Sequence, residues 1–307
     1  MNKKYQMLAI LGPTASGKTS VAVHVALNLD GEVISADSRQ VYRGMDIGTG
    51  KDSADYTVDE VSVPCHLTDI LDAGEKYNVF RYQNDFLRVY NDIISRKKFP
   101  ILCGGSGLYI ESVLKKYHLT QVPRNQELRR KLQGKSIEEL IEILKQEKKD
   151  LHNTTDFEDT RRAIRAIEIE NYIKNHPLEK SPIPKIKTLI VGIKSERDIR
   201  RQRITDRLKA RLKEGMVEEV ENLLKNGIPP EQLTYYGLEY KFVTLYITGQ
   251  IDYKEMYQRL EIAIHQFSKR QMTWFRGMER RGIPIHWIDS IIPLEQKMNL
   301  IKNWLTE

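Results

Sequence analysis

The segment Gly12–Thr19, with the sequence GPTASGKT, constrains this chain more than any other feature. It follows a short apolar run, Met7–Leu11, and precedes a segment with helical apolar spacing, Ser20–Leu29. A strand, a glycine-bounded loop and a helix in this order form a phosphate cradle, because backbone N–H groups of the loop and of the helix start converge on one point. A glycine-rich turn without a ligand is the alternative.

Each residue of this loop is a predicted contact of a diphosphate or similar anion. Lys18 is expected to neutralise the terminal phosphates, and the Thr19 hydroxyl is expected to reach a phosphate oxygen or a bound Mg²⁺. The predicted phosphate-binding residues are Gly12, Pro13, Thr14, Ala15, Ser16, Gly17, Lys18 and Thr19. The motif does not indicate what carries the phosphates, since one fold hosts many reactions.

The composition is that of a soluble globular protein. The 307 residues are 40% hydrophobic and 30% charged, and no apolar run approaches the roughly 18 residues of a membrane span. Only two cysteines are present, Cys65 and Cys103, which favours a reduced, cytoplasmic setting. The net charge of +7 permits a nucleic-acid partner without requiring one.

The order of elements predicts an α/β fold, with a P-loop NTPase-like parallel sheet flanked by helices. Strands are expected at Glu32–Asp37, Phe99–Cys103, Thr188–Ile193 and Ile283–Ile288. Helices are expected at Asn78–Arg96, Leu108–Leu114, Glu196–Leu224 and Tyr253–Arg276. The segment Asn226–Pro230 ends the third of these helices, as glycine and proline beyond a helix should.

The segment from 116 to 180 differs from its surroundings, because short amphipathic helices replace the strand pattern. Two capping boxes, Ser136-x-x-Glu139 and Thr155-x-x-Glu158, support those helices, and a proline-rich link, Pro177–Pro184, closes the segment. We therefore expect an all-helical insertion domain at 116–180. The α/β core would comprise 1–115 and 181–307.

Asp37 stands at the end of the predicted second strand. In an open parallel sheet ligands lie beyond the carboxyl ends of the strands, so Asp37 should face the same crevice as the phosphate loop. A carboxylate there can hold Mg²⁺ or accept a proton from a nucleophile, and a helix N-cap is the structural alternative. His66 could serve as a general base, although a hydrogen-bonded structural role is more common. No spacing of His and Cys fits a zinc site.

Two groups of arginines suggest anion binding. Arg203 and Arg207 are four residues apart on one helix face and could clamp a phosphate group, although a solvated basic face would explain them too. Arg161, Arg162 and Arg165 form a second basic cluster in the insertion, which suits a polyanionic substrate.

The strings GPTASGKT, ISADSRQVYRGMDIGTGK, GGSGLYIE, RRAIRAIEI and KRQMTWFR together resemble the tRNA dimethylallyltransferases. These enzymes prenylate adenosine 37 of certain tRNAs. The matches run in order from about residue 7 to 290, and the DSRQVY and KRQMTWF strings are far more specific than the phosphate loop.

The resemblance implies that the loop holds the diphosphate of dimethylallyl diphosphate. Lys18, Thr19, Mg²⁺ and an arginine, for which Arg207 is the best candidate, would stabilise the leaving diphosphate. Asp37 then becomes the general base for the N6 amine rather than a metal ligand. The implied catalytic residues are Asp37, Thr19 and Arg207, with Thr19 as the Mg²⁺ ligand.

The resemblance also implies a tRNA partner, held at its anticodon stem–loop. The adenine would be extruded from its stack to reach the site. The implied tRNA-binding residues are Asp37, Ser38, Arg39 and Gln40 in the core, and Arg161, Arg162, Ala163, Ile164 and Arg165 in the insertion. A monomer and no membrane association are expected.

The chain departs from the family pattern at several positions. The family commonly has T-A-K where Thr49-Gly50-Lys51 stands, His-His where Cys65-His66 stands, and G-G-T where Gly104-Gly105-Ser106 stands. The stretch Tyr235–Tyr240 only loosely matches the usual I-G-Y-[KR]-E. A tRNA contact through that stretch is therefore an open question.

Three other activities are compatible with parts of the sequence. A P-loop small-molecule kinase would turn over a nucleotide, and a close relative would prenylate free AMP, ADP or ATP. The third alternative is an RNA-binding module with a relic phosphate loop. Intact Lys18, Thr19 and Asp37 argue against the relic, and the arginine-bearing insertion argues against a mononucleotide acceptor.

Overall fold

A computed structural model describes residues 4–51, 53–147, 159–176 and 183–306. The chain divides into two compact units, one made of 1–116 and 182–307, the other of 117–181. The sequence predicted boundaries at 115/116 and 180/181. The capping box at Thr155 and Glu158 and most of the proline-rich link lie outside the described residues.

The larger unit is built on a six-stranded sheet whose order is β5-β2-β6-β1-β7-β8. Every neighbouring pair in it runs parallel. Its strands are β1 (Met7–Leu11), β2 (Gly31–Ser35), β5 (Cys65–His66), β6 (Phe99–Gly104), β7 (Thr188–Lys194) and β8 (His286–Asp289). The predicted parallel α/β fold is confirmed.

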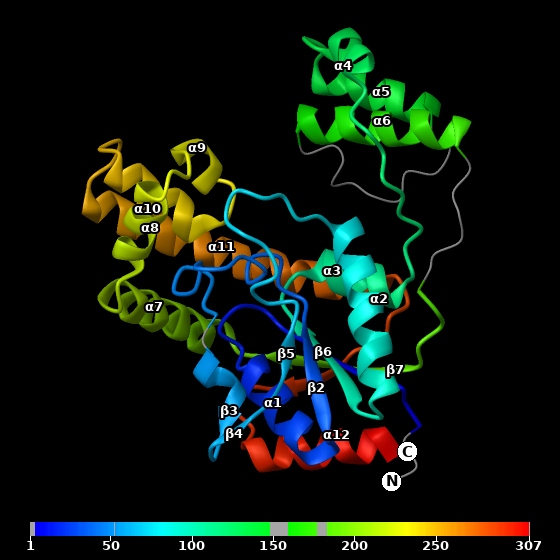
Figure 1. Cartoon of the computed structure of the whole chain (residues 1–307), viewed down its shortest axis with the longest axis vertical. Helices are drawn as coiled ribbons and strands as arrows, with labels where there is room; N and C mark the ends of the chain where they lie inside the picture. The colour runs from blue at the N-terminus through cyan, green and yellow to red at the C-terminus, as the bar shows by residue number, and fades with distance from the viewer. Residues whose placement is uncertain (1–3, 52, 148–158, 177–182, 307) are drawn as a thin grey trace. The chain divides into compact units, whose positions relative to one another are not determined.

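Alternation along β1 explains how the sheet is covered on both faces. Leu8 and Ile10 belong to an apolar core that contains helix α1, whereas Met7, Ala9 and Leu11 belong to a second core on the other face. All five side chains are buried, as expected for a central parallel strand. Figure 1 shows helices on both sides of the sheet.

The helices of the larger unit fall into two layers. The first core joins α1 (Lys18–Leu29) to α12 (Leu294–Thr306). The second core contains residues of α2 (Val79–Ser95), α3 (Gly107–Leu114), α7 (Arg197–Lys213), α8 (Met216–Lys225), α9 (Pro230–Leu233), α10 (Leu238–Ile247) and α11 (Tyr253–Arg280). A 3₁₀ turn, η1 (Ser53–Tyr56), and a small antiparallel pair, β3 (Thr57–Val58) with β4 (Val61–Ser62), complete this unit.

The single long helix predicted at 196–224 is wrong. The structure has α7 and α8, separated at Gly215, whose φ of 103° lies in the left-handed region. A helix cannot continue through that conformation, and only glycine adopts it at low cost. The apolar spacing runs on through both helices, so the pattern gave no sign of the break.

Several predicted boundaries shift by a few residues. β2 ends at Ser35, two residues before Asp37, and β8 begins at His286 rather than at 283. α11 extends to Arg280. The strands predicted from the sequence do not include residues 65–66, which form β5, a strand too short to show alternation.

The regular secondary structure described in the smaller unit is all helical. It contains α4 (Gln126–Leu132), α5 (Ile137–Glu147) and α6 (Thr160–Asn175), packed around a small apolar core that includes Leu140 and Ala163. The capping box at the start of α5 is present: the Ser136 N–H donates to Glu139 Oε2 at 2.7 Å, and the Glu139 N–H donates to Ser136 Oγ at 3.3 Å.

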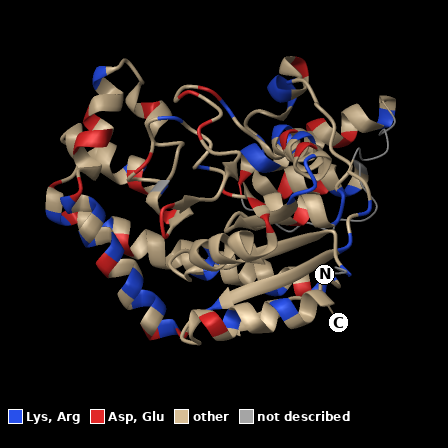
Figure 2. Ribbon diagram, turned by 60° about the horizontal axis from the view of Figure 1, so that its bottom comes forward, with Lys and Arg blue, Asp and Glu red and all other residues tan. Residues whose placement is uncertain are grey.

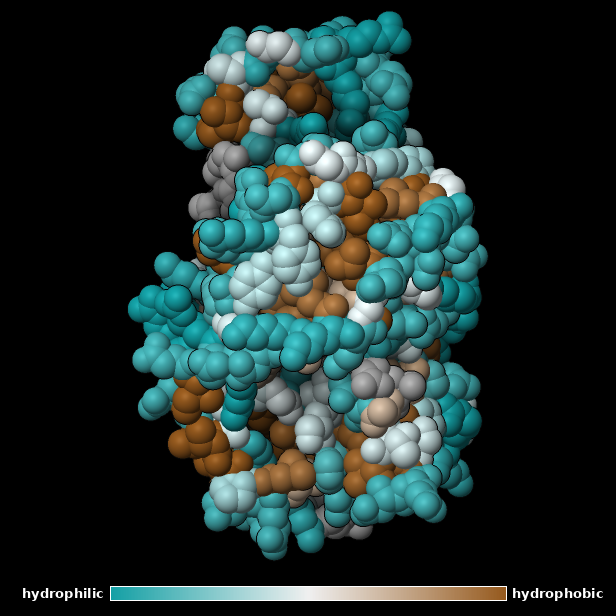
Figure 3. All heavy atoms as spheres, turned by 90° about the vertical axis from the view of Figure 1, so that its left-hand side faces the viewer, coloured by the Kyte–Doolittle hydropathy of each residue, from teal (hydrophilic) through white to brown (hydrophobic). Residues whose placement is uncertain are grey.

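On the face drawn in Figure 3, hydrophobic residues form patches among hydrophilic ones. Figure 3 shows one face on which hydrophilic residues predominate. None of the described helices combines the length and the hydrophobicity needed to cross a bilayer.

Candidate active site

The phosphate loop lies at the carboxyl end of β1, between its neighbours β6 and β7. Gly17 adopts φ 83° and directly precedes α1, which begins at Lys18. This places the free N–H groups of the first turn of α1 beside the loop, the arrangement that binds anions. The helical spacing in the sequence begins at Ser20. In the structure α1 begins two residues earlier, so Lys18 and Thr19 belong to the helix.

Two distant side chains hold Thr14 in the middle of the loop. The Thr14 N–H donates to Oε1 of Gln271 at 2.8 Å, and Nε2 of Gln271 donates to the Gly105 carbonyl at 2.9 Å. Arg207 donates to the Thr14 hydroxyl from α7. Gln271 belongs to the KRQMTWF string, but the sequence analysis gave it no role, since nothing local indicates that α11 reaches the loop.

Ser16 supplies an observation that favours a ligand. Its side chain is 1% exposed, and its hydroxyl has no hydrogen-bond partner among the described residues. Buried hydroxyl groups are normally hydrogen-bonded, so an unpaired one inside a phosphate loop is explained by an anion that would accept its proton.

The charges around the loop are strongly coupled. Burial lowers the pKa of Lys18, while the nearby Cys103 and Asp37 oppose the shift. Burial, followed by the neighbouring Arg211, lowers the pKa of Arg207 to about 10, so Arg207 remains charged at neutral pH. A site that holds two such cations in a desolvated setting is suited to a diphosphate.

Asp37 lies two strands away from the phosphate loop along the sheet edge. It follows β2, β2 pairs with β6, and β6 pairs with β1. At about 4.8 Å per strand, the axes of β2 and β1 are roughly 10 Å apart. Asp37 is within electrostatic range of both Lys18 and Arg207. The carboxylate therefore belongs to the same charged cluster as the loop.

Hydrogen bonds fix the segment that Asp37 begins. The Arg39 N–H donates to Asp37 Oδ1 at 2.9 Å, and the Ser38 N–H donates to the Ser106 hydroxyl at 3.0 Å. Gln40 Nε2 donates to the Gly50 carbonyl at 3.2 Å. Ser106 stands where the family commonly has threonine, and its hydroxyl holds the Asp37–Gln40 turn.

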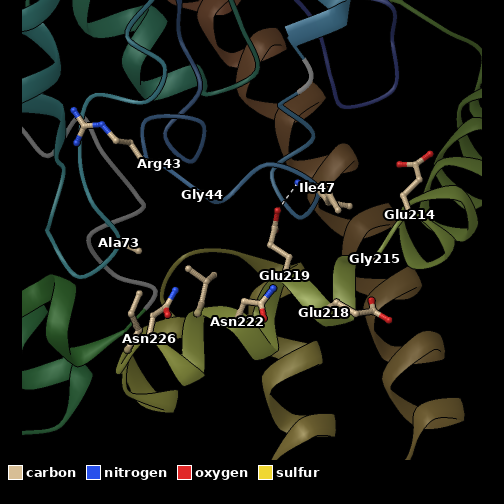
Figure 4. Close-up of a pocket in the computed structure, with 12 residues that line it drawn as sticks. Arg43, Gly44, Ile47, Ala73, Glu214, Gly215, Glu218, Glu219, Asn222 and Asn226 are labelled. Carbon is tan, nitrogen blue, oxygen red and sulfur yellow. Dashed lines mark hydrogen bonds between the residues drawn. The ribbon is translucent and has the colours of Figure 1, made fainter.

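Glu219 of α8 anchors the far end of this 37–51 segment. Its carboxylate accepts the consecutive N–H groups of Asp46, Ile47 and Gly48 at 2.8, 2.7 and 3.0 Å. The Tyr240 hydroxyl donates to the same carboxylate at 2.7 Å. Figure 4 shows Glu219 pointing from α8 toward Ile47. The sequence gives no sign of this anchor, because Glu219 looks like any other charged residue of an amphipathic helix.

The diverged stretch 235–240 packs against the 37–51 segment. The guanidinium of Arg39 lies 5.2 Å from the centre of the Tyr235 ring, and the rings of Tyr42 and Tyr236 are 4.6 Å apart. Further aromatic rings adjoin Asp37, since Tyr82 and Tyr109 stack at 4.3 Å and both interact electrostatically with its carboxylate. Aromatic rings thus lie within electrostatic range of the Asp37 carboxylate.

His66 has a structural role in this geometry. Its Nε2 lies 2.6 Å from Glu32 Oε2, and Arg96 binds the same carboxylate with two nitrogens. Glu32 lies near the start of β2, away from the carboxyl ends of the strands. The general-base hypothesis for His66 is therefore not supported, and the structural alternative is.

The clamp predicted from Arg203 together with Arg207 is wrong. Arg203 donates to the Ser290 hydroxyl at 3.0 Å, next to β8, while Arg207 reaches the phosphate loop. Both residues lie on one face of α7, as predicted. Because they are one helical turn apart, Arg203 contacts the end of β8 and Arg207 contacts the loop after β1. Figure 2 shows the basic residues along α7, at the lower left.

The basic cluster of the smaller unit divides into buried and exposed residues. Arg165 donates to Glu168 Oε2 and to the Val122 carbonyl, so it is tied into the unit. Ala163 is fully buried, and Ile164 packs against the core. The Ala163 side chain has no access to solvent, so it does not present a surface to RNA. Arg161 and Arg162 are exposed.

Within the described ranges, no group of three or more His, Cys, Asp or Glu side chains is arranged to hold a metal ion. Cys65 and Cys103 are both free thiols, and burial raises the pKa of Cys103 to about 12. A thiol with such a pKa is not a nucleophile at neutral pH.

Comparison with known proteins assigns this geometry to a family. The IPP transferase family model matches residues 40–278, and an isopentenyl transferase model matches residues 5–60. The chain belongs to the IPP transferase family.

Similar proteins cover nearly the whole chain. A tRNA dimethylallyltransferase 2 of Porphyromonas gingivalis is 61% identical over 96% of this chain and 97% of its own length. A tRNA dimethylallyltransferase 2 of Bacteroides fragilis is 58% identical over 99% of both chains.

Solved structures agree with this assignment. The tRNA isopentenylpyrophosphate transferase of Bacillus halodurans is 32% identical, with a TM-score of 0.72 over 99% of this chain and 96% of that one. A eukaryotic dimethylallyltransferase acting on tRNA is 21% identical and has a TM-score of 0.78 over 99% of this chain and 80% of its own, which supports the fold alone.

Proposed function

We propose that this chain transfers the dimethylallyl group of dimethylallyl diphosphate to N6 of adenosine 37 in tRNAs that read codons beginning with U. The observation that carries the proposal is the pairing, at one sheet edge, of a cationic phosphate loop with Asp37. Membership of the IPP transferase family and the names of the similar proteins support tRNA as the acceptor.

The chemistry must activate the electrophile, since the lone pair of the exocyclic N6 amine is delocalised into the adenine ring. The allylic C–O bond breaks and its electron pair leaves with diphosphate, while the N6 lone pair forms the new C–N bond. Lys18, Arg207 and the loop N–H groups would stabilise the charge that builds on diphosphate. The amine then loses a proton, and Asp37 is the base in the proposal.

The residues of the loop also fit a magnesium ion. The Thr19 hydroxyl, at the second position of α1, would bind Mg²⁺ together with the diphosphate oxygens. When bound, the ion would add positive charge against the leaving group.

The tRNA would be bound by both units. Ser38, Arg39 and Gln40 follow Asp37 directly and are proposed to contact the extruded adenine, a step that costs a few kcal/mol of stacking. In the smaller unit, Arg161 and Arg162 are proposed to contact phosphates of the anticodon stem–loop. We further propose that the enzyme acts in the cytoplasm as a monomer.

The test uses labelled dimethylallyl diphosphate, Mg²⁺ and an unmodified tRNA transcript with adenosine at position 37. The matched control is the same transcript with guanosine there. Label in the first transcript and none in the second is the expected result. Labelled AMP with unlabelled tRNA would move the proposal to a free-nucleotide acceptor, and phosphate transfer from ATP would indicate a P-loop kinase.

A further inference from the structure

Three arginines on one face of α7 reach three different parts of the larger unit. Arg203 reaches Ser290 beside β8, and Arg207 reaches Thr14 in the phosphate loop. One turn further along, Arg211 reaches Gly50 at the end of the 37–51 segment. The established features of the site account for Arg207, whereas Arg211 has no assigned role.

The guanidinium of Arg211 occupies the space in which a side chain at position 50 would begin. A Cβ atom on Gly50 would overlap Nη2 of Arg211 and would lie 2.6 Å from its Cζ. Gly50 also has a φ of 65°, in the left-handed region. This guanidinium lies directly over the backbone whose carbonyl accepts the hydrogen bond of Gln40.

Glu239 supplies the opposite charge. Its Oε1 lies 3.8 Å from Nη1 of Arg211, and the two side chains are only 19% and 12% exposed. Burial raises the pKa of Glu239, and the neighbouring Arg211 and Arg207 oppose that shift. Glu239 therefore interacts with both arginines, one at the phosphate loop and one at Gly50.

We propose that Arg211 and Glu239 are a positioning pair, which fixes the 37–51 segment relative to Arg207 and the phosphate loop. This inference rests on the proposed function and deepens it, since the pair would set the distance between the two reacting groups. It also joins two departures from the family pattern, Gly50 and the diverged 235–240 stretch. Because Gly50 has no Cβ, it leaves room for Arg211, which pairs with Glu239 of the 235–240 stretch.

The test is a double-mutant cycle on Gly50 and Arg211. Gly50→Ala adds the overlap and the cost of a left-handed alanine. Gly44→Ala is the matched control, because Gly44 lies in the same segment, has φ 67°, and has open space where its Cβ would be. We expect kcat/KM for tRNA to be roughly tenfold lower in the Gly50→Ala variant than in the Gly44→Ala variant. The KM for dimethylallyl diphosphate should change by less than about threefold, because the loop itself is untouched.

In the Arg211→Ala background the overlap is gone. Gly50→Ala should then cost no more than Gly44→Ala does in the wild type, so the two substitutions are strongly non-additive. Glu239→Gln should lower kcat/KM for tRNA in the same direction, while Glu231→Gln, an exposed carboxylate on α9, should leave it unchanged.

Equal costs of Gly50→Ala in both backgrounds would overturn the proposal. So would equal effects on the tRNA and diphosphate parameters. Thermal unfolding of the same variants reports the coupling without any turnover. The melting temperatures of the variants could show the coupling while the folded wild-type protein labels no tRNA. That combination would refute the proposed function and leave the pairing of Arg211 with Gly50 standing.

Discussion

The phosphate loop and the 37–51 segment face each other across the site, but they are held in opposite ways. The loop is defined by its own sequence: β1 leads into it, Gly17 turns it, and α1 continues from it. The 37–51 segment contains no helix, and the preceding strand, β2, ends at Ser35, before the segment begins. Side chains from remote elements hold it, chiefly Glu219 and Ser106, and Arg211 lies beside Gly50.

This difference has a consequence for how substitutions act. A change inside the loop alters diphosphate binding directly, because the loop makes the site from its own N–H groups. The 37–51 segment can instead be displaced by changes far away in sequence, with the diphosphate site intact. Independent measurements of diphosphate affinity and of kcat/KM for tRNA therefore separate the two regions.

The largest effect is expected from Asp37→Ala. Removal of the proposed base should lower kcat by about a hundredfold or more, the usual range for general-base loss. Affinity for diphosphate should stay within several-fold, since Asp37 is not part of the loop. Single-turnover labelling of tRNA and isothermal titration with diphosphate measure the two quantities. Loss of both together would show that Asp37 supports the loop or a metal instead.

A smaller but still large effect is expected from Glu219→Ala. The change leaves three consecutive N–H groups and the Tyr240 hydroxyl without their acceptor, which costs roughly 1–3 kcal/mol for each group that stays buried. The 37–51 segment should loosen, and kcat/KM for tRNA should fall about tenfold or more. Steady-state labelling with varied tRNA measures this.

Glu218→Ala is the control for that prediction, since Glu218 is the exposed neighbour on α8. It should leave kcat/KM for tRNA within about twofold of the wild type. If both glutamates matter equally, the loss comes from the charge of α8 rather than from the anchor. In that case the 37–51 segment is held by something other than Glu219.

Gln271→Ala tests a remote support of the phosphate loop. Its amide joins the Thr14 N–H to the Gly105 carbonyl, so its removal leaves one part-buried and one buried backbone group without this partner. Diphosphate affinity should weaken several-fold, by roughly 1 kcal/mol, while the tRNA parameters follow only through diphosphate. Titration with diphosphate measures it, and Arg270→Ala, an exposed neighbour, serves as control. A larger effect on tRNA than on diphosphate would contradict the assignment.

The same contrast explains what could be predicted from the sequence. The parallel sheet and the loop at 12–19 follow from local patterns, because a buried strand, a glycine and a helix start are encoded within some twenty residues. The position of Asp37 followed from the rule that ligands lie beyond strand ends. The site is therefore predictable where neighbours in sequence make it.

The remote supports were not predictable in this way. Glu219, Gln271 and Arg211 act through contacts with residues more than 150 positions away. In a single sequence each is one polar residue on an amphipathic helix. The break at Gly215 and the separation of Arg203 from Arg207 have the same origin, since tertiary packing decides them.

The smallest effect on activity is expected at the opposite end of β2, where Glu32, His66 and Arg96 form an ionic cluster. The Arg96 guanidinium lowers the pKa of Glu32 to about 2, with a further contribution from His66, although burial opposes the shift. A carboxyl group whose pKa is lower in the folded state stabilises the protein at pH values above its pKa in the unfolded chain. That stabilisation should be complete above about pH 4.5 and lost as the pH falls toward 2.

Glu32→Gln should therefore lower the melting temperature most near neutral pH, and the difference from the wild type should shrink between about pH 4.5 and pH 2. His66→Asn should leave kcat within about twofold, since its partner Glu32 lies at the start of β2 and not at the carboxyl end, where the phosphate loop and Asp37 lie. Melting curves across pH and labelling at saturating substrates measure the two. A kcat for His66→Asn that falls a hundredfold would return His66 to the chemistry. The division between an active strand end and a purely structural one would then be wrong.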